Sequence, residues 1–206
     1  MVAASDRPTQ LVGTDPAPQE RGPGRVDAAR NRALILDAAR RLIAERGPDA
    51  VSTDDIAVAA GVGKGTVFRR FGSRAGLMMV LLDEDETAEQ DAFMFGPPPL
   101  GPGAPPLDRL LAYGADRLRF VHCHQALLSD AVRDPALRYT GPFTLHRTHV
   151  RMLLETAGTT GDLDAQADAL IALLDPDYLA HQLSLGRSLD DLTGAWQDTA
   201  RKLCGR

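Results

Sequence analysis

Apolar residues recur at helical spacing along most of the chain from about residue 27 onward. In the segment NRALILDAARRLIAERG they fall at i, i+3, i+4, i+7 and i+8, which predicts one buried helix face formed by Ile35, Ala38, Ala39, Leu42 and Ile43. Gly47 suits the left-handed end of that helix, and Pro48 prevents its continuation. No segment shows a convincing alternation of apolar and polar residues, so the pattern predicts an all-α fold.

Two short helices are expected after this first one. Ser52 is a good N-cap, and Asp55 three residues later completes a capping box with a shorter acid. This second helix ends at Gly61, and the segment KGTVFRRF, residues 64–71, predicts a third. Two short helices joined by a tight glycine turn are typical of a helix–turn–helix, whose second helix enters the major groove of DNA.

A long fourth helix is expected to follow, with Ser73 as its N-cap, and to run through LMMVLLDEDETAEQDAF. Residues 83–91 of this helix carry six acids, and the simplest interpretation is a solvated end that lies far from DNA. The next segment, residues 96–107, holds six prolines and three glycines, so we expect a loop or a mobile linker there.

The remainder of the chain also has helical spacing. Asp162 and Ser188 are expected N-caps, and Pro176 predicts a kink or a break between two helical segments. Residues 1–24 are rich in proline, glycine and polar residues, which predicts a disordered tail. The arginines near its end belong either to a solvated tail or to a basic arm that contacts DNA.

Charge is unevenly distributed in this chain of net charge −5. Residues 24–75 contain ten Lys or Arg against six Asp or Glu, whereas the rest is strongly acidic. A basic module within an acidic chain favours a polyanion as the partner of that module. No apolar run is long enough for a membrane span and no secretory signal is evident, so we expect a cytoplasmic protein without a membrane partner.

The expected third helix has the chemistry of a DNA-contacting element. It carries cations at Lys64, Arg69 and Arg70 and has no acid, and Gly63 and Gly65 let the backbone approach a phosphate. Arginine can also read guanine through two parallel hydrogen bonds. Val67 and Phe71 lie four residues apart and are expected to face the core.

The residues from 35 to 82 resemble the DNA-binding domain of TetR-family transcriptional regulators. The resemblance rests on the apolar first helix followed by STDDIA, AAGV, KGTVF, RF and a capped fourth helix. It implies a homodimeric repressor with about nine helices that binds a palindromic operator. It also implies DNA contacts by Thr53, Lys64, Gly65, Thr66, Phe68, Arg69, Arg70 and Arg74.

Two positions depart from the family pattern. The family usually has tyrosine where this chain has Phe68, which has no hydroxyl for a phosphate, and often a stronger capping residue than Gly63. We expect a helix–turn–helix domain at residues 25–75 and a helical ligand-binding and dimerisation domain at 76–206. The last two helices, around DALIALLDPDYLAHQLSLG and SLDDLTGAWQDTARKL, resemble the family's dimerisation pair, and two such hairpins would form a four-helix bundle.

The middle helices are expected to surround a site for a small-molecule effector of unknown identity. Its candidate wall mixes apolar bulk with polar tips and consists of Tyr113, Phe120, His124, Leu127, Phe143 and His146. His122 and His124 point apart on a helix, so we expect no metal site and no cofactor. Plain core packing is the alternative for each of these residues.

No catalytic motif is present, and we therefore expect no enzyme activity. The favoured function is a repressor that a small ligand releases from its operator. The alternative is a constitutive or activating DNA-binding regulator without small-molecule release.

Overall fold

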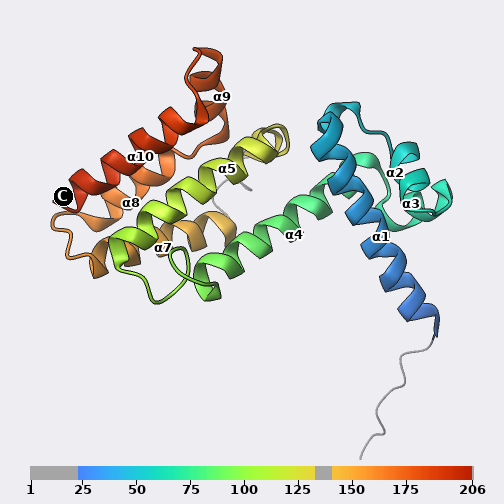
Figure 1. Ribbon diagram of the computed structural model, residues 1–206, viewed down its shortest axis with the longest axis horizontal. Helices are drawn as coiled ribbons and strands as arrows, with labels where there is room; N and C mark the ends of the chain where they lie inside the picture. Colours follow the sequence, from blue (N-terminus) through green and yellow to red (C-terminus); the bar gives the residue numbers. More distant parts are fainter. Residues whose placement is uncertain (1–22, 133–140, 206) are drawn as a thin grey trace, which may run out of the picture. The chain divides into compact units, whose positions relative to one another are not determined.

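The computed structural model of the protein describes residues 23–132 and 141–205. Within these ranges the chain is helical and contains no strand, so the predicted all-α fold is confirmed (Figure 1). The chain divides into two compact units, residues 1–70 and 71–206. None of the described helices is long and apolar enough to cross a membrane. The predicted disordered tail lies outside the described residues, except for Pro23 and Gly24.

The first unit begins with helix α1, Pro23–Arg46, which is followed by a 3-10 turn, Pro48–Ala50. Helix α2, Thr53–Ala59, packs against α1, and helix α3, Lys64–Phe71, follows after a short turn. Helix α1 starts four residues before the predicted start near Asp27, because proline is tolerated in the first turn of a helix, where its missing N–H would have no partner.

The sequence signals for helix ends are confirmed in this unit. The Ser52 hydroxyl accepts a hydrogen bond from the Asp55 N–H at 3.1 Å, and the Asp55 carboxylate accepts one from the Ser52 N–H at 3.0 Å. This is the predicted capping box. Gly47 has a φ of 79°, the left-handed conformation that lets the chain turn after α1.

The second unit is a bundle of helices (Figure 1). Its helices are α4 (Arg74–Phe95), α5 (Pro106–Val132), α7 (Gly141–Thr156), α8 (Leu163–Ala172), α9 (Pro176–Ser184) and α10 (Leu189–Leu203). Helices α5 and α7 pack against each other, and α10 packs against α5 and α8. Helices α4 and α9 also pack against α5.

The predicted N-caps of this unit are also present. The side chains of Ser73, Asp162 and Ser188 accept backbone N–H groups at the starts of α4, α8 and α10. Of the two outcomes expected at Pro176, the structure has a break: Asp175 caps α9, and Pro176 is among its first residues. The predicted penultimate dimerisation helix is therefore two helices, α8 and α9.

The proline-rich segment between α4 and α5 is an ordered loop, which agrees with the first of the two alternatives for it. The guanidinium of Arg109 donates hydrogen bonds to the carbonyl of Phe93 at 3.0 Å and to that of Leu100 at 3.4 Å. Gly101 is buried against the backbone of Gly96, where a side chain would not fit. These contacts tie the loop to the end of α4 and the start of α5.

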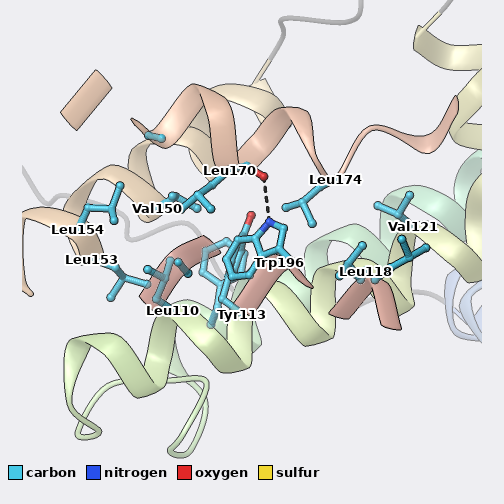
Figure 2. Close-up of a cluster of buried hydrophobic side chains, with 14 of the residues drawn as sticks. Leu110, Tyr113, Leu118, Val121, Val150, Leu153, Leu154, Leu170, Leu174 and Trp196 are labelled. Atoms are coloured by element: carbon cyan, nitrogen blue, oxygen red, sulfur yellow. Dashed lines mark hydrogen bonds between the residues drawn. The ribbon is translucent and has the colours of Figure 1, made fainter. Parts of the chain in front are cut away.

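Trp196 of α10 lies at the centre of the hydrophobic core of the second unit (Figure 2). Its indole N–H donates a hydrogen bond to the Leu170 carbonyl at 2.9 Å, which joins α10 to α8. Gly114 of α5 faces the indole ring so closely that a Cβ at this position would overlap the ring carbons. The close approach of α5 and α10 therefore depends on the missing side chain at position 114.

We expect Gly114→Ala to destabilise the second unit by about 1–3 kcal/mol, the usual cost of overfilling a packed core. Gly141→Ala at the first residue of α7 is the matched control, because a Cβ there meets nothing within 4 Å. It should be neutral or stabilise by up to about 1 kcal/mol, since alanine favours a helix. Urea unfolding followed by circular dichroism measures both changes, and equal stability of the two variants would contradict this account of the α5–α10 contact.

Candidate nucleic-acid surface and buried polar cluster

A hydrogen-bonded turn connects α2 to α3. The N–H of Val62 donates to the Ala57 carbonyl at 3.0 Å, and the N–H of Gly61 donates to the Val58 carbonyl at 3.1 Å. Gly61 has a φ of 66°, so the turn has the hydrogen-bond pattern of a Schellman motif. Helix α3 begins at Lys64, two residues after Val62. This turn connects two helices that are too short to be stable alone.

The outward face of α3 carries most of the residues that the sequence predicted to contact DNA. Val67 is buried and Phe71 half-buried, as expected for the inward face. A Cβ added at Gly63 or Gly65 would meet nothing within 4 Å, so the backbone at the start of α3 is open to a ligand. The exposed residues of this face are Lys64, Gly65, Phe68, Arg69 and Arg70.

Two of the cations on this face have partners within the first unit. The ammonium of Lys64 lies 2.8 Å from the Asp54 carboxylate of α2, and both side chains are largely exposed. The Nε of Arg69 donates to the Gly65 carbonyl at 3.2 Å. Helix α3 has no acid of its own, but α2 places one beside Lys64. A phosphate must therefore compete with Asp54 for this lysine.

The other predicted DNA contacts differ in position. Thr53 is half-buried at the first residue of α2, and Thr66 is half-buried in α3. Phe68 is 68% exposed, although its side chain has no polar group. Arg74 belongs to the second unit, at the first residue of α4. Seven of the eight predicted residues therefore lie in the first unit.

The second unit contains a buried cluster of polar side chains, which we call the Glu–Arg–His cluster: Glu86, Glu89, Tyr113, Arg117 and His146. Arg117 of α5 forms ion pairs with Glu86, at 2.8 Å, and with Glu89, both of α4. His146 of α7 lies with its Nε2 2.5 Å from Glu86 Oε1 and its Nδ1 2.9 Å from the Tyr113 hydroxyl. The cluster thus connects α4, α5 and α7.

The protonation states of this cluster follow from its burial and charges. Burial alone would raise the pKa of Glu86, but the hydrogen bond with His146 and the positive charge of Arg117 outweigh it and lower the pKa to about 2. Burial raises the pKa of Glu89 to about 7, because Arg117 offsets only part of that cost. Burial lowers the pKa of His146. An ionised Glu86 only accepts, so the Nε2–H of His146 donates to it and Nδ1 accepts from Tyr113.

The expectation that the acids of residues 83–91 are solvated is wrong for Glu86 and Glu89. Both are buried, with 8% and 7% of their surface exposed. They continue the helical stripe of Met78, Leu82 and Phe93, which is buried along the same helix. That spacing is visible in the sequence, and it was the signal that could have identified the two acids and led to Arg117 as their counter-ion.

The candidate wall of the effector site falls into separate groups. Tyr113 and His146 are buried and hydrogen-bonded to each other. Phe120 stacks on His124, with ring centroids 4.3 Å apart, and His124 Nε2 lies 3.0 Å from the Asp85 carboxylate. Leu127 and Phe143 are half-buried on α5 and α7. Arg117 links the two groups, because its guanidinium lies 4.7 Å from the centre of the Phe120 ring.

A shallow hollow of about 190 Å³ lies elsewhere in the second unit, beside Trp196. None of the six candidate wall residues contributes to it. Its volume is below the roughly 300 Å³ at which small-molecule sites usually begin. The hollow is lined by Leu118, Leu173, Tyr178, Leu179, Arg187, Leu192, Ala195, Trp196 and Thr199.

The other histidines and the cysteines occupy different environments. His122 is exposed and His124 half-buried, so they point apart on α5 as predicted. His149 is buried between Phe93 and Tyr113, and its Nε2 has no hydrogen-bond partner among the described residues. Cys123 and Cys204 are both free thiols. One carboxylate oxygen each from Glu86 and Glu89 and one nitrogen of His146 lie within 4.8 Å of one another, close enough to share a metal ion.

Residues 35–79 match the sequence profile of the family described as "Bacterial regulatory proteins, tetR family". Over 51 residues the chain is 51% identical to the HTH-type transcriptional repressor Rv3405c of Mycobacterium tuberculosis. It is equally similar to the HTH-type transcriptional regulator Mb3439c of Mycobacterium bovis. The matched segment covers 25% of this chain and 27% of each relative, so the chain spans about a quarter of the length of these curated relatives.

Solved structures share the fold over most of the chain. A TetR-like transcriptional regulator from Rhodococcus sp. RHA1 is 23% identical with a TM-score of 0.57, and 85% of this chain and 97% of that one are covered. A transcriptional regulator from Saccharomonospora viridis, solved in complex with choline, is 24% identical with a TM-score of 0.64. That match covers 82% of this chain and 95% of the other. Because both sequence identities are below 25%, the similarity to these two structures is a similarity of fold alone.

The buried His149 should make the stability of the second unit depend on pH. Burial, together with the positive charge of Arg109, lowers its pKa from 6.5 to about 4. Between these values the unfolded chain binds a proton that the folded chain does not, so the free energy of unfolding decreases as the pH falls from 6.5 to 4. The decrease due to His149 is at most about 3 kcal/mol.

We expect His149→Leu to reduce this slope. Urea unfolding at several pH values, followed by the fluorescence of the single tryptophan, Trp196, measures the slope. The same slope in His149→Leu and in the unaltered protein would show that His149 does not titrate in this way.

Proposed function

The chain belongs, through residues 35–79, to the tetR family of bacterial regulatory proteins, and from this premise we propose that it is a sequence-specific DNA-binding transcriptional regulator. The observation that carries the proposal is the outward face of α3. This face follows a Schellman turn, exposes Lys64, Arg69 and Arg70, and contains no acid. We assign DNA binding to residues 25–75 and ligand binding and dimerisation to residues 76–206.

Helix α3 would contact both the phosphates and the bases of DNA. The open backbone at Gly63 and Gly65, at the positive end of the helix dipole, suits a phosphate. Lys64 would exchange its exposed partner Asp54 for a phosphate, at small cost because exposed ion pairs contribute little stability. Arg69 or Arg70 would bind guanine in the major groove. Thr53, Thr66 and Arg74 would add phosphate contacts, and Phe68 would pack.

We further propose that the regulator is a homodimer that contacts DNA twice. Two-fold symmetry would place the two α3 helices about 34 Å apart, or a multiple of that distance, on a palindromic operator. The dimer would form through the C-terminal helices α8, α9 and α10. Two large apolar side chains near α9 support this assignment, because Tyr178 is 38% and Leu185 64% exposed. Tyr178 and Leu185 are seven positions apart, about two helical turns, so they fall on the same side of a helix. Exposed apolar side chains on one side of a helix favour a protein partner.

The regulator is proposed to be a repressor that a small ligand releases from DNA. The Saccharomonospora viridis protein of the same fold was solved with choline, which supports a small molecule as the effector class. The proposed wall consists of Tyr113, Phe120, His124, Leu127, Phe143 and His146. Helix α4 follows α3 in the chain after only Gly72 and Ser73, so a displacement of α4 by the ligand would reach α3. Ligand and DNA would then weaken each other's binding by the same factor.

The alternative function is a constitutive or activating DNA-binding regulator without small-molecule release. The close packing of Tyr113 and His146, which are 1% and 3% exposed, favours this alternative over an open effector site. A screen of small molecules for release of the bound duplex distinguishes the two functions. Release by a compound that binds the second unit supports the repressor with an effector.

The DNA-binding proposal is tested by selecting duplexes from a random pool with the purified protein. We expect enrichment of a palindrome whose affinity falls steeply with salt concentration, because cations of α3 displace counterions from phosphates. In the Arg69→Ala, Arg70→Ala double variant, the affinity for the selected duplex should fall by at least about tenfold, since one good arginine–guanine contact is worth about 1–3 kcal/mol.

The matched control is the Arg119→Ala, Arg151→Ala double variant, which removes two cations from α5 and α7, outside both α3 and the proposed dimer helices. It has the same change in net charge but should retain the affinity and most of the salt dependence. If the pool yielded no enriched sequence, or if both double variants bound equally well, α3 would not be the DNA-reading element.

A further inference from the structure

We propose that the second unit binds one divalent transition-metal ion through Glu86, Glu89 and His146. The three side chains come from two helices, α4 and α7, and each can offer one ligand atom, all within 4.8 Å of one another. The side chains of Glu89 and His146 are 5% and 4% exposed, and that of Glu86 is 11% exposed. The site lies wholly within the second unit, so metal binding does not depend on whether α3 binds DNA.

One carboxylate oxygen, Glu89 Oε1, is available for a metal. Glu86 Oε1, in contrast, accepts hydrogen bonds from His146 and, at 2.9 Å, from Gln90 Nε2, which a metal would replace. Arg117 pairs with the Oε2 atoms of both Glu86 and Glu89. Glu89 Oε1 is buried and has no hydrogen-bond partner among the described residues. A buried carboxylate oxygen without a partner is costly, and a cation that coordinates it removes that cost. Arg117 would then act as an outer partner that holds both carboxylates in position.

His146 completes the ligand set because its ring is held from the opposite side. Its Nε2 lies 2.5 Å from Glu86 Oε1, and its Nδ1 lies 2.9 Å from the Tyr113 hydroxyl. A metal would replace the proton between Nε2 and Glu86. That proton is the only one on the neutral ring; it would move to Nδ1, and the Tyr113 hydroxyl, which otherwise donates to Nδ1, would rotate and accept from it. A hydrogen bond on the far nitrogen is the usual device that orients a metal-binding histidine.

The donor set indicates the class of ion. One imidazole nitrogen and two carboxylate oxygens suit Zn²⁺, Mn²⁺, Fe²⁺ or Co²⁺, whereas Mg²⁺ and Ca²⁺ prefer oxygen alone. Three protein ligands leave at least one position for water or another small ligand. No large cavity is needed, since the ion would lie between side chains that already approach each other.

The test uses the full-length, untagged protein, freed of metal by dialysis against a chelator and titrated with Zn²⁺ and, separately, with Co²⁺. We expect one ion per chain and, with Co²⁺, visible absorption bands of a nitrogen- and oxygen-ligated site. Glu89→Gln and His146→Gln should each lower the affinity at least about tenfold, the smallest loss usual even for an outer partner of a metal site. Mg²⁺ should not compete at equal concentration.

The matched control is His122→Gln, at an exposed histidine of α5 that belongs to neither the metal site nor the proposed effector wall. This variant should bind the ion as the unaltered protein does. Circular dichroism of each variant shows whether it is folded. Glu89→Gln keeps the shape of the side chain and an oxygen for Arg117, so it is the variant expected to remain folded.

Three results would overturn the proposal. They are the absence of binding by the unaltered protein at micromolar metal, binding that persists unchanged in a folded Glu89→Gln variant, and binding that is lost only in His122→Gln. If Glu89→Gln did not fold, the decision would rest on the stoichiometry and the Co²⁺ spectrum of the unaltered protein. Each of these results would leave the proposed DNA binding intact, because duplex selection and the α3 variants measure DNA binding separately.

Discussion

The turn between α2 and α3 is the constraint on which the DNA-binding interpretation depends. Gly61 takes a left-handed backbone conformation there, and the N–H groups of Gly61 and Val62 satisfy carbonyls at the end of α2. A residue with a Cβ would be strained at this φ. The turn needs only a few residues, so α3 can begin at Lys64 with Val67 inward and its cations outward. Without this turn, the eight residues of α3 would be a basic segment with no fixed position beside α2.

The Glu–Arg–His cluster has a corresponding role in the second unit. Removing two carboxylates and a guanidinium from water is costly, and this cost is recovered only if the groups satisfy one another. Arg117 and His146 satisfy three of the four carboxylate oxygens and leave Glu89 Oε1 without a partner. The cluster therefore ties α4 to α5 and α7 but is incomplete. Helix α4 also follows α3 in the chain, so this cluster lies on the helix that is covalently connected to α3.

The sequence predicted the elements well because their ends depend on local chemistry. Caps such as Ser52 and Ser188, and glycines such as Gly47, act within a few residues of their own position, so a single sequence is enough to find them. The outward cations of α3 were predicted for the same reason. Helix α1 begins earlier than predicted, since its first residues, Pro23 and Gly24, continue the proline- and glycine-rich composition of the segment before them.

The buried polar cluster could not be predicted in the same way. Arg117 and His146 lie 31 and 60 positions after Glu86, so the pairing depends on the packing of helices that are distant in the sequence. The acidic run of residues 83–91 predicts a solvated surface, because its six acids outweigh the apolar stripe on which two of them lie. The ion pair between Lys64 and Asp54 likewise spans the α2–α3 turn and needed the fold to be seen. The wall of the effector site stays a prediction.

The central claim is that α3 reads the major groove of DNA, and dimethyl sulfate probing of the bound, selected duplex tests it most directly. This reagent methylates guanine N7 in the major groove and adenine N3 in the minor groove. The account predicts protection of guanine N7 in two segments related by two-fold symmetry, about one helical turn or a multiple of it apart, with minor-groove adenines unprotected. Protection restricted to adenine N3, or no protection of guanine N7 in a duplex that the protein binds and that contains guanine in both half-sites, would contradict it.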